Sequence, residues 1–156
     1  YNCKVKIIRP FNVFGPLMNK KDYRVIPNII NKILNKNKIL IHGNGKQIRH
    51  YLHIDDLTDG ILLILKKKLT GQTINFGSNE NYNNKELIKK ICKHMNMNFD
   101  KSTKFIKDRP FNDVRYKVST KKAKSFGWST NKNLNDSLPD LIKWYASNKT
   151  LFKNIK

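Results

Sequence analysis

The sequence predicts an α/β fold built as one globular unit. Short β-branched segments alternate with segments in which apolar residues recur at helical spacing. The 156 residues, with 38% hydrophobic content, provide enough apolar surface for one core and are too short for two complete domains. The unit is expected to span 1–156, with strands at 5–8, 39–41, 48–54 and 73–77.

The first third of the chain predicts a strand, a loop, a helix and a second strand. Segment 5–8 is apolar and β-branched, and it leads into 9–16, where two prolines and a glycine predict an irregular loop. Pro27 lies near the first turn of the helix, where its missing N–H has no cost. The apolar face of this helix consists of Ile26, Ile29, Ile30, Ile33 and Leu34. Strand 39–41 then ends at the turn 42–45.

Residues 48–54 alternate in polarity, which predicts a single half-buried strand. In this strand Ile48, Leu52 and Ile54 should face the core. The opposite face should carry Arg49, Tyr51 and His53. Asp55 and Asp56 are expected to cap the following helix. Its predicted apolar stripe consists of Leu57, Ile61, Leu62 and Leu65.

The second half continues the alternation. Strand 73–77 follows Gly71, and Asn83 with Glu86 has the spacing of a capping box. The helix that this box opens should bury Leu87, Ile88, Ile91, Cys92 and Met95. After a polar, aromatic loop at 108–116, a short helix should begin at Ser119 and stop at Gly127. Leu138, Leu141, Ile142 and Tyr145 predict a final helix, and we expect Trp128 and Trp144 to serve packing.

Several classes of protein and site are not expected. No window approaches the roughly 20 apolar residues of a membrane span and no secretory signal opens the chain, so a soluble cytoplasmic protein is expected. The chain begins at Tyr1 and not at a methionine, which indicates a piece of a longer polypeptide. Cys3 and Cys92 are expected to be reduced thiols. His50 and His53 should point to opposite faces of a strand, so no metal site is expected.

The net charge of +21 and a pI of 10.1 first suggest a nucleic-acid-binding protein. Only five of the 32 basic residues are arginine, however, and lysines occur in every segment. No helix-turn-helix, finger or stacking-platform motif is present. We therefore expect no specific nucleic-acid partner, only non-specific attraction to polyanions at low salt. A basic nucleic-acid-binding module stays open as an alternative.

The scarce arginines are concentrated where a ligand site could form. Arg9, Arg49, Arg109 and Arg115 lie at strand ends or in loops beside Gly, Pro and Asn. A planar guanidinium makes paired, charge-assisted hydrogen bonds to a diphosphate that a lysine ammonium does not reproduce. Two arginines from separate loops could therefore hold one diphosphate. The alternative is that each arginine pairs with a nearby carboxylate, of Asp55, Asp108 or Asp113.

The combined motifs resemble a known family. They are Arg9-Pro-Phe-Asn12-Val-Phe-Gly15-Pro16, Gly43-Asn-Gly45-Lys-Gln-Ile-Arg49-His-Tyr-Leu-His-Ile-Asp55-Asp56, Asn75-Phe-Gly77, Asp108-Arg109-Pro-Phe-Asn-Asp113-Val-Arg115-Tyr116, Gly127-Trp128 and Trp144-Tyr145. In order and spacing, from about residue 5 to 148, they are similar to the C-terminal half of nucleoside-diphosphate-glucose 4,6-dehydratases. These enzymes are extended short-chain dehydrogenases with a Rossmann-type fold, in the NAD-dependent epimerase/dehydratase family. The Asp-Arg-Pro loop favours the dehydratases over the related epimerases and decarboxylases, which stay open as alternatives.

The resemblance implies a substrate site. It implies that Asn12 contacts the sugar or diphosphate, that Arg49 and Arg109 hold the phosphoryl oxygens, and that Asn75 and Asn112 belong to the same site. It also implies that Ile41 and His42 lie near the base and that Tyr116 reaches the phosphate or ribose. The implied substrate is dTDP- or UDP-glucose, and the sequence does not decide between thymidine and uridine.

The resemblance further implies a cofactor that this chain does not hold. The family binds NAD at a glycine-rich fingerprint, which does not occur in these residues. It also uses a catalytic Tyr-x-x-x-Lys, and we expect that catalytic pair to belong to the missing half. We therefore expect no catalytic residue here. The missing N-terminal half should bind NAD and carry the interface of a homodimer, while 1–16 and 72–78 add strands to the Rossmann sheet of the parent.

Overall fold

The computed structural model describes residues 5–18, 24–67, 70–111 and 113–148. Within these residues, strands and helices alternate along the chain, as an α/β fold requires. The elements are β1 Lys6–Pro10, β2 Val13–Phe14, α1 Val25–Leu34, β3 Ile39–His42, β4 Ile48–His50, β5 Leu52–His53, α2 Ile54–Lys66, β6 Gln72–Phe76, β7 Asn81–Asn83, α3 Asn84–His94, α4 Phe99–Ser102, β8 Thr103–Ile106, α5 Lys121–Ser125 and α6 Leu134–Ser147.

The described strands form four pairs. β1 runs parallel to β6, with Lys6 opposite Gln72 and Pro10 opposite Phe76. β2 with β5 and β3 with β8 are also parallel, whereas β4 and β7 are antiparallel. Parallel partners far apart in sequence with helices between them confirm the predicted α/β class. No helix among the described residues is long and apolar enough to cross a membrane.

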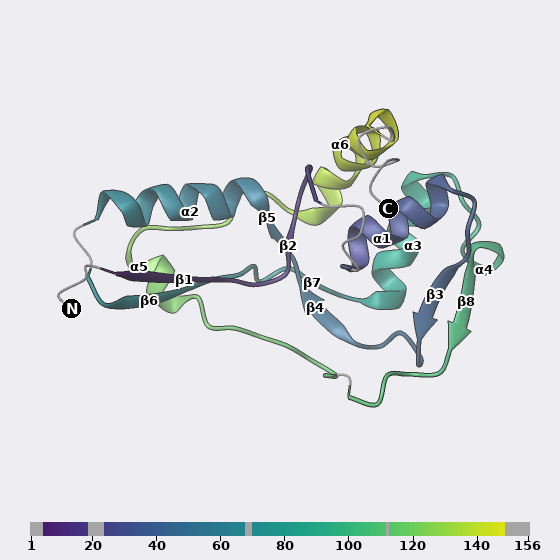
Figure 1. Cartoon of the computed structure of the whole chain (residues 1–156), viewed down its shortest axis with the longest axis horizontal. Coiled ribbons are helices and arrows are strands. Elements are labelled where there is room, and N and C mark those ends of the chain that lie inside the picture. Colours follow the sequence, from purple (N-terminus) through teal and green to yellow (C-terminus); the bar gives the residue numbers. More distant parts are fainter. Residues whose placement is uncertain (1–4, 19–23, 68–69, 112, 149–156) are drawn as a thin grey trace.

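Two hydrophobic clusters lie at opposite ends of the molecule. Figure 1 shows α2 and α5 beside the β1–β6 pair at one end, and α1, α3 and α6 with the β3–β8 pair at the other. The first cluster lies between β6 and α2 and includes Leu52, Ile64, Ile74, Phe76 and Trp128. The second cluster joins the three helices and includes Phe14, Ile30, Ile41, Tyr51, Ile91, Leu138 and Tyr145. Residues 107–111 and 113–120, between β8 and α5, lie along one side of the molecule (Figure 1).

The capping box that opens α3 is confirmed. The side chain of Asn83 accepts a hydrogen bond from the backbone N–H of Glu86 at 2.8 Å, and the carboxylate of Glu86 accepts one from the backbone N–H of Asn83 at 3.0 Å. Each group satisfies a donor that the start of a helix leaves without a partner. Cys92 is buried on this helix as a free thiol, while Cys3 lies outside the described residues.

The prediction of one alternating strand over 48–54 was wrong. The chain breaks at Tyr51, and both His50 and Tyr51 are buried, each 5% exposed. The reason is a change of partner. β4 pairs with β7, whereas β5 pairs with β2. A regular two-residue alternation requires one continuous ladder, and this segment belongs to two.

The predicted cap of α2 was also wrong. His53 precedes the helix, and its Nδ1 accepts a hydrogen bond from the backbone N–H of Asp55 at 3.1 Å. Asp56 lies in the first turn, where its buried carboxylate accepts hydrogen bonds from the backbone N–H groups of Asn131 at 2.9 Å and Lys132 at 3.1 Å. Asp56 therefore holds the segment before α6 in place. Local sequence patterns do not reveal this contact, because its partners lie far away in the sequence.

The buried stripe of α2 differs from the predicted one. Leu57 is buried as expected, but Leu62 and Leu65 are 49% and 63% exposed. The core-facing positions are Gly60 and Ile64, because the aromatic rings of Phe76 and Trp128 pack against Gly60. The irregular loop predicted over 9–16 contains β2, and β7 and α4 were not predicted. All three are too short to show a periodic pattern.

We predict that Gly60→Ala destabilises the protein by about 1–3 kcal/mol in urea unfolding. Alanine normally favours a helix over glycine by about 1 kcal/mol. Here its Cβ would lie 2.3 Å from Phe76 Cε1 and 2.9 Å from Trp128 Nε1, so two packed rings would have to move. Asp59→Ala, at the exposed neighbouring position of the same helix, should change stability by less than about 0.5 kcal/mol. A Gly60→Ala variant as stable as this control would contradict the packing.

His50 is a buried imidazole with only one of its nitrogens satisfied. Nδ1 lies 3.0 Å from the carbonyl oxygen of Ser78. A carbonyl accepts but does not donate, so Nδ1 carries the proton, and Nε2 is buried without a hydrogen-bond partner among the described residues. Burial lowers the pKa of His50, the Ser78 carbonyl opposes this effect, and the positive charges of Arg115 and Lys117 add to it.

We predict that protonation of His50 destabilises the fold in mild acid. In the unfolded chain its pKa is 6.5, whereas the folded pKa is lower. Stability is therefore complete above pH 6.5 and is lost as the pH falls toward the folded pKa. The free energy of unfolding, measured at about pH 7.5 and about pH 5.5, should fall less in His50→Gln than in the wild type. His94→Gln, at an exposed position of α3, is the control and should keep the wild-type drop. A drop in the free energy of unfolding of His50→Gln equal to that of the wild type would contradict this prediction.

Candidate functional site

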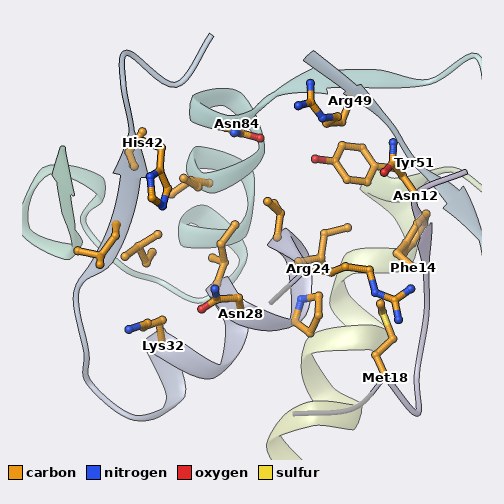
Figure 2. A pocket seen from close by; sticks show the side chains of 18 of the residues that line it. Asn12, Phe14, Met18, Arg24, Asn28, Lys32, His42, Arg49, Tyr51 and Asn84 are labelled. Carbon is orange, nitrogen blue, oxygen red and sulfur yellow. The ribbon is translucent and has the colours of Figure 1, made fainter. Parts of the chain in front are cut away.

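A cavity of about 630 Å³ lies at the helix-rich end of the molecule. Figure 2 shows its walls, formed by α1, β3, the start of α3, and the segments around β2 and β4. The volume falls in the range of sites for small organic ligands, roughly 300–1,000 Å³. Isoleucines from α1 and β3 supply apolar surface, and amide and cationic side chains supply polar groups.

The charged side chains that line the cavity all have one sign. They are Arg24, Lys32, Arg49 and Arg109, and no carboxylate occurs among the lining residues that the structure describes. In Figure 2, Arg49, Tyr51 and Asn12 lie on one side of the cavity and His42 and Lys32 on the other. Fixed charges of one sign in a hollow with apolar walls attract ligands of the opposite charge. The cavity therefore suits an anion larger than a single phosphate.

Arg49 is held by backbone groups on both sides. Its Nη1 donates to the carbonyl oxygen of Ile48 at 2.9 Å and to that of Asp113 at 2.8 Å. The backbone N–H of Ile48 donates to the carbonyl of Val114 at 2.9 Å. These bonds fasten the 108–116 loop along β4. In these contacts Asp113 meets Arg49 through its main-chain carbonyl and not through its carboxylate.

Arg109 reaches the cavity because its loop is tied to the end of β3. Asp108 accepts hydrogen bonds from Gln47 Nε2 at 3.0 Å and from the backbone N–H of Arg109 at 2.8 Å. The backbone N–H of Gly43 donates to the carbonyl of Ile106 at 3.0 Å. Gly43 has a φ of 60°, and a Cβ there would lie 2.6 Å from Asp108 Oδ2. Only glycine permits this approach, which brings Arg109 to the same cavity as Arg49.

Two uncharged polar side chains also face the cavity. Asn12 has a φ of 46°, an unusual conformation outside glycine, and its Nδ2 is buried without a hydrogen-bond partner among the described residues. The hydroxyl of Tyr51 is likewise buried and unpaired within the described part of the chain. Burial raises the pKa of Tyr51 well above its usual range, so the hydroxyl stays neutral. Buried polar atoms without partners in a cavity are what a bound polar ligand would satisfy.

Five of the eight predicted site residues line this one cavity: Asn12, Ile41, His42, Arg49 and Arg109. Asn75 does not line it, because its Nδ2 points to the carbonyl of Ser119 at 3.4 Å. Tyr116 packs against the ring of Phe11, with the centroids 5.5 Å apart, and does not line the cavity either. Asn112 lies outside the described residues. The ligand roles of all eight stay predictions.

Sequence analysis missed five polar lining residues: Arg24, Asn28, Lys32, Tyr51 and Asn84. The first three are spaced by four residues at α1 and therefore share one face of the helix. That spacing was visible in the sequence, but a polar helical face usually contacts solvent. Tyr51 was assigned to the outer face of a strand that does not form. Asn84 follows the capping residue of α3, and nothing in the local sequence distinguishes it.

Comparison with known proteins identifies relatives over nearly the whole chain. Residues 1–77 match the NAD dependent epimerase/dehydratase family. The chain is 30% identical to the dTDP-D-glucose 4,6-dehydratase of Homo sapiens, with 100% of this chain and 45% of that enzyme aligned. It is 32% identical to a trifunctional UDP-glucose 4,6-dehydratase/UDP-4-keto-6-deoxy-D-glucose 3,5-epimerase/UDP-4-keto-L-rhamnose-reductase of Arabidopsis thaliana, with 95% of this chain and 22% of that enzyme aligned.

A solved structure agrees with these sequence matches. The dTDP-glucose 4,6-dehydratase from Streptomyces venezuelae, determined with NAD bound, superimposes with a TM-score of 0.89 at 25% identity, covering 98% of this chain and 47% of that one. The chain thus spans less than half the length of each of these three relatives. The fold and the sequence matches agree that the chain belongs to the NAD dependent epimerase/dehydratase family and matches a C-terminal portion of its 4,6-dehydratases.

Proposed function

We propose that the chain is the nucleotide-sugar-binding part of an NDP-glucose 4,6-dehydratase, which converts dTDP- or UDP-glucose to the 4-keto-6-deoxy sugar. One observation carries the proposal. Arg49 of β4 and Arg109 of the loop after β8, far apart in the sequence, line a single cavity that has no carboxylate among its described lining residues. Two guanidinium forks beside one hollow suit a diphosphate better than a neutral or cationic ligand.

The lining residues suggest how the substrate lies. In this proposal the diphosphate lies beside Arg49 and Arg109, with Asn12 close to it. The base lies toward β3, where Ile41 is buried and His42 ends the strand. Flat apolar walls of isoleucine suit a planar base, and cations suit the phosphates. The hexose then extends toward the part of the parent that these residues do not include.

The chain contributes binding and orientation in this proposal. Held at its diphosphate, the substrate would present the hexose in one orientation, which reduces the entropic barrier to reaction. NAD, held by another part of the parent, would supply the hydride transfer that this reaction requires. The residues present do not fit NAD, because none of their turns carries the glycine-rich phosphate-binding fingerprint. We therefore assign NAD binding and proton transfer to the preceding half of the parent.

An open apolar face supports such a second half. β1 and β6 form a parallel pair, yet Val5 and Ile7 are 52% and 48% exposed. Leu62 and Leu65 of α2 are exposed at the same end of the molecule. Parallel sheets in α/β proteins are normally covered on both faces. We propose that segments 1–16 and 72–78 extend the Rossmann sheet of the parent and that the cofactor half covers this surface.

The names of the sequence relatives favour a dehydratase over a 4-epimerase or a decarboxylase. The relatives from human and from Arabidopsis thaliana both carry 4,6-dehydratase in their names. The loop that contains Asp108 and Arg109 matches that branch as well. A product assay on the parent distinguishes the three activities, because a 4-keto-6-deoxy sugar, a C4 epimer and a pentose differ in mass or configuration.

We predict that Arg49→Lys and Arg109→Lys each weaken the binding of UDP and dTDP by at least about 10-fold. A charge-assisted hydrogen bond contributes about 1.5–3 kcal/mol, and an ammonium keeps the charge but loses the paired geometry. Calorimetric titration in about 0.15 M salt would limit non-specific attraction. Lys122→Met, on α5 and away from the cavity, removes a full charge and should bind as the wild type does. Wild-type affinity in both arginine variants would refute the diphosphate assignment.

We also predict that the 156 residues alone do not turn over dTDP-glucose or UDP-glucose. With NAD added, mass spectrometry of the nucleotide sugar should show no loss of water, because the chain lacks the glycine-rich fingerprint. Its one Tyr-x-x-x-Lys spacing, Tyr145 to Lys149, begins at a tyrosine that is buried in the hydrophobic core. The parent enzyme, assayed under the same conditions, should give the dehydrated product. Dehydration by the isolated chain would place the catalytic groups within it and overturn the division of roles.

A further inference from the structure

A single buried amide connects three walls of the cavity. Gln47 is 6% exposed and lies between β3 and β4. Its Nε2 donates to Asp108 Oδ2 at 3.0 Å and also lies 3.4 Å from the carbonyl oxygen of His42. Its Oε1 accepts from Asn84 Nδ2 at 3.4 Å, and its backbone carbonyl accepts from the backbone N–H of Asn84 at 3.2 Å. Gln47 thus joins the end of β3, the Arg109 loop and the first residue of α3.

The charge of Asp108 fixes the direction of these hydrogen bonds. An ionised carboxylate only accepts, so the amide of Gln47 must turn its NH₂ group toward Asp108. Its oxygen then faces Asn84. Because that oxygen also only accepts, Asn84 must turn its own NH₂ group toward Gln47. The carboxylate therefore determines the orientation of an amide that it does not touch.

This orientation leaves the acceptor atom of Asn84 without a described partner at the cavity wall. Asn84 lines the cavity, and its Oδ1 is buried without a hydrogen-bond partner among the described residues. Arg24, Lys32, Arg49 and Arg109, which also line it, carry only donors. Phosphate oxygens accept and do not satisfy Asn84 Oδ1. A ligand that carries both a phosphate and a hydroxyl or N–H donor satisfies both sets of groups.

We infer that Gln47 is a positioning residue that, under the charge of Asp108, presents Asn84 Oδ1 as an acceptor to a hydroxyl or N–H group of the bound nucleotide. The inference deepens the proposed function and rests on it for the identity of the ligand. It assigns a selective role to the relay formed by Asp108, Gln47 and Asn84. The relay favours a nucleoside diphosphate over a bare pyrophosphate, since pyrophosphate carries no ribose or base.

An exchange of charge tests the relay. Gln47→Glu places two carboxylates in contact, so it should lower the melting temperature and raise the dissociation constant for UDP by at least about 10-fold. Adding Asp108→Asn to Gln47→Glu restores a donor. The introduced amide then donates to the introduced carboxylate, whose other oxygen accepts from Asn84. The double variant should recover the melting temperature and bind UDP within about 3-fold of the wild type.

Two comparisons separate this role from simple packing. Binding of inorganic pyrophosphate should change less than binding of UDP in Gln47→Glu, since only UDP offers donors to Asn84. Gln47→Met keeps the size of the side chain without its polarity and should lose affinity for UDP as Gln47→Glu does. The control variant Gln72→Glu with Asp140→Asn makes the same two types of substitution outside the cavity. It should leave the dissociation constants for UDP and pyrophosphate unchanged.

Each result of these experiments tests a different part of the inference. A double variant that binds UDP no better and melts no higher than Gln47→Glu would overturn the relay, as would wild-type affinity in Gln47→Met. Equal losses for UDP and pyrophosphate would overturn its selective role. Absence of UDP and dTDP binding in the folded wild type would instead refute the proposed function. In that case the melting temperatures alone test the hydrogen bonds from Asp108 through Gln47 to Asn84. Recovery of the melting temperature in the double variant supports these bonds, and no recovery overturns them.

Discussion

The cavity depends on the carboxylate of Asp108. One of its oxygens accepts from the backbone of Arg109 and the other from Gln47, so a loop that follows β8 is fastened to the turn that follows β3. The close approach requires glycine at position 43, because a Cβ would collide with the carboxylate. Together with the backbone bonds of Ile106, Asp113 and Val114, this contact holds the loop where Arg109 lines the cavity. The site is therefore shaped by a negative charge that does not line it, in a chain whose net charge is +21.

The same use of carboxylates recurs elsewhere in the fold. Asp56, 2% exposed, accepts from the backbone N–H groups of Asn131 and Lys132 and so joins α2 to the segment before α6. Glu80 accepts from the backbone N–H of Leu134 and from the hydroxyl of Tyr82, each at 2.6 Å. Charge-assisted bonds of this kind are about twice as strong as neutral ones. With only 11 acidic residues in the chain, these carboxylates connect segments far apart in sequence, while the many lysines occupy the surface.

Periodicity predicted the parts of the fold that local sequence determines. The helices α1, α3 and α6 are long enough to repeat an apolar pattern, and the capping box at Asn83 is a local motif. Tyr51 was misplaced because β4 and β5 belong to different ladders, and Asp56 was misassigned because its partners lie in another part of the chain. In the candidate site, the scarcity of arginine pointed to Arg49 and Arg109. Lys32 and Asn84 escaped notice because only the tertiary structure shows that their surroundings are a cavity.

Binding and chemistry are separable in the proposed arrangement. The cavity is lined by residues of this chain at one end of the molecule, whereas Val5 and Ile7 are exposed at the β1–β6 end. The β4–β5 segment lies between the two ends and carries Arg49 to the cavity and Leu52 to the other hydrophobic cluster. Because β5 pairs with β2, which follows β1 directly, a change at the open sheet is connected to the cavity through a short stretch of backbone. Docking of a cofactor half on that sheet would therefore act on strands that also position the diphosphate, so substrate binding and assembly of the catalytic site should favour each other.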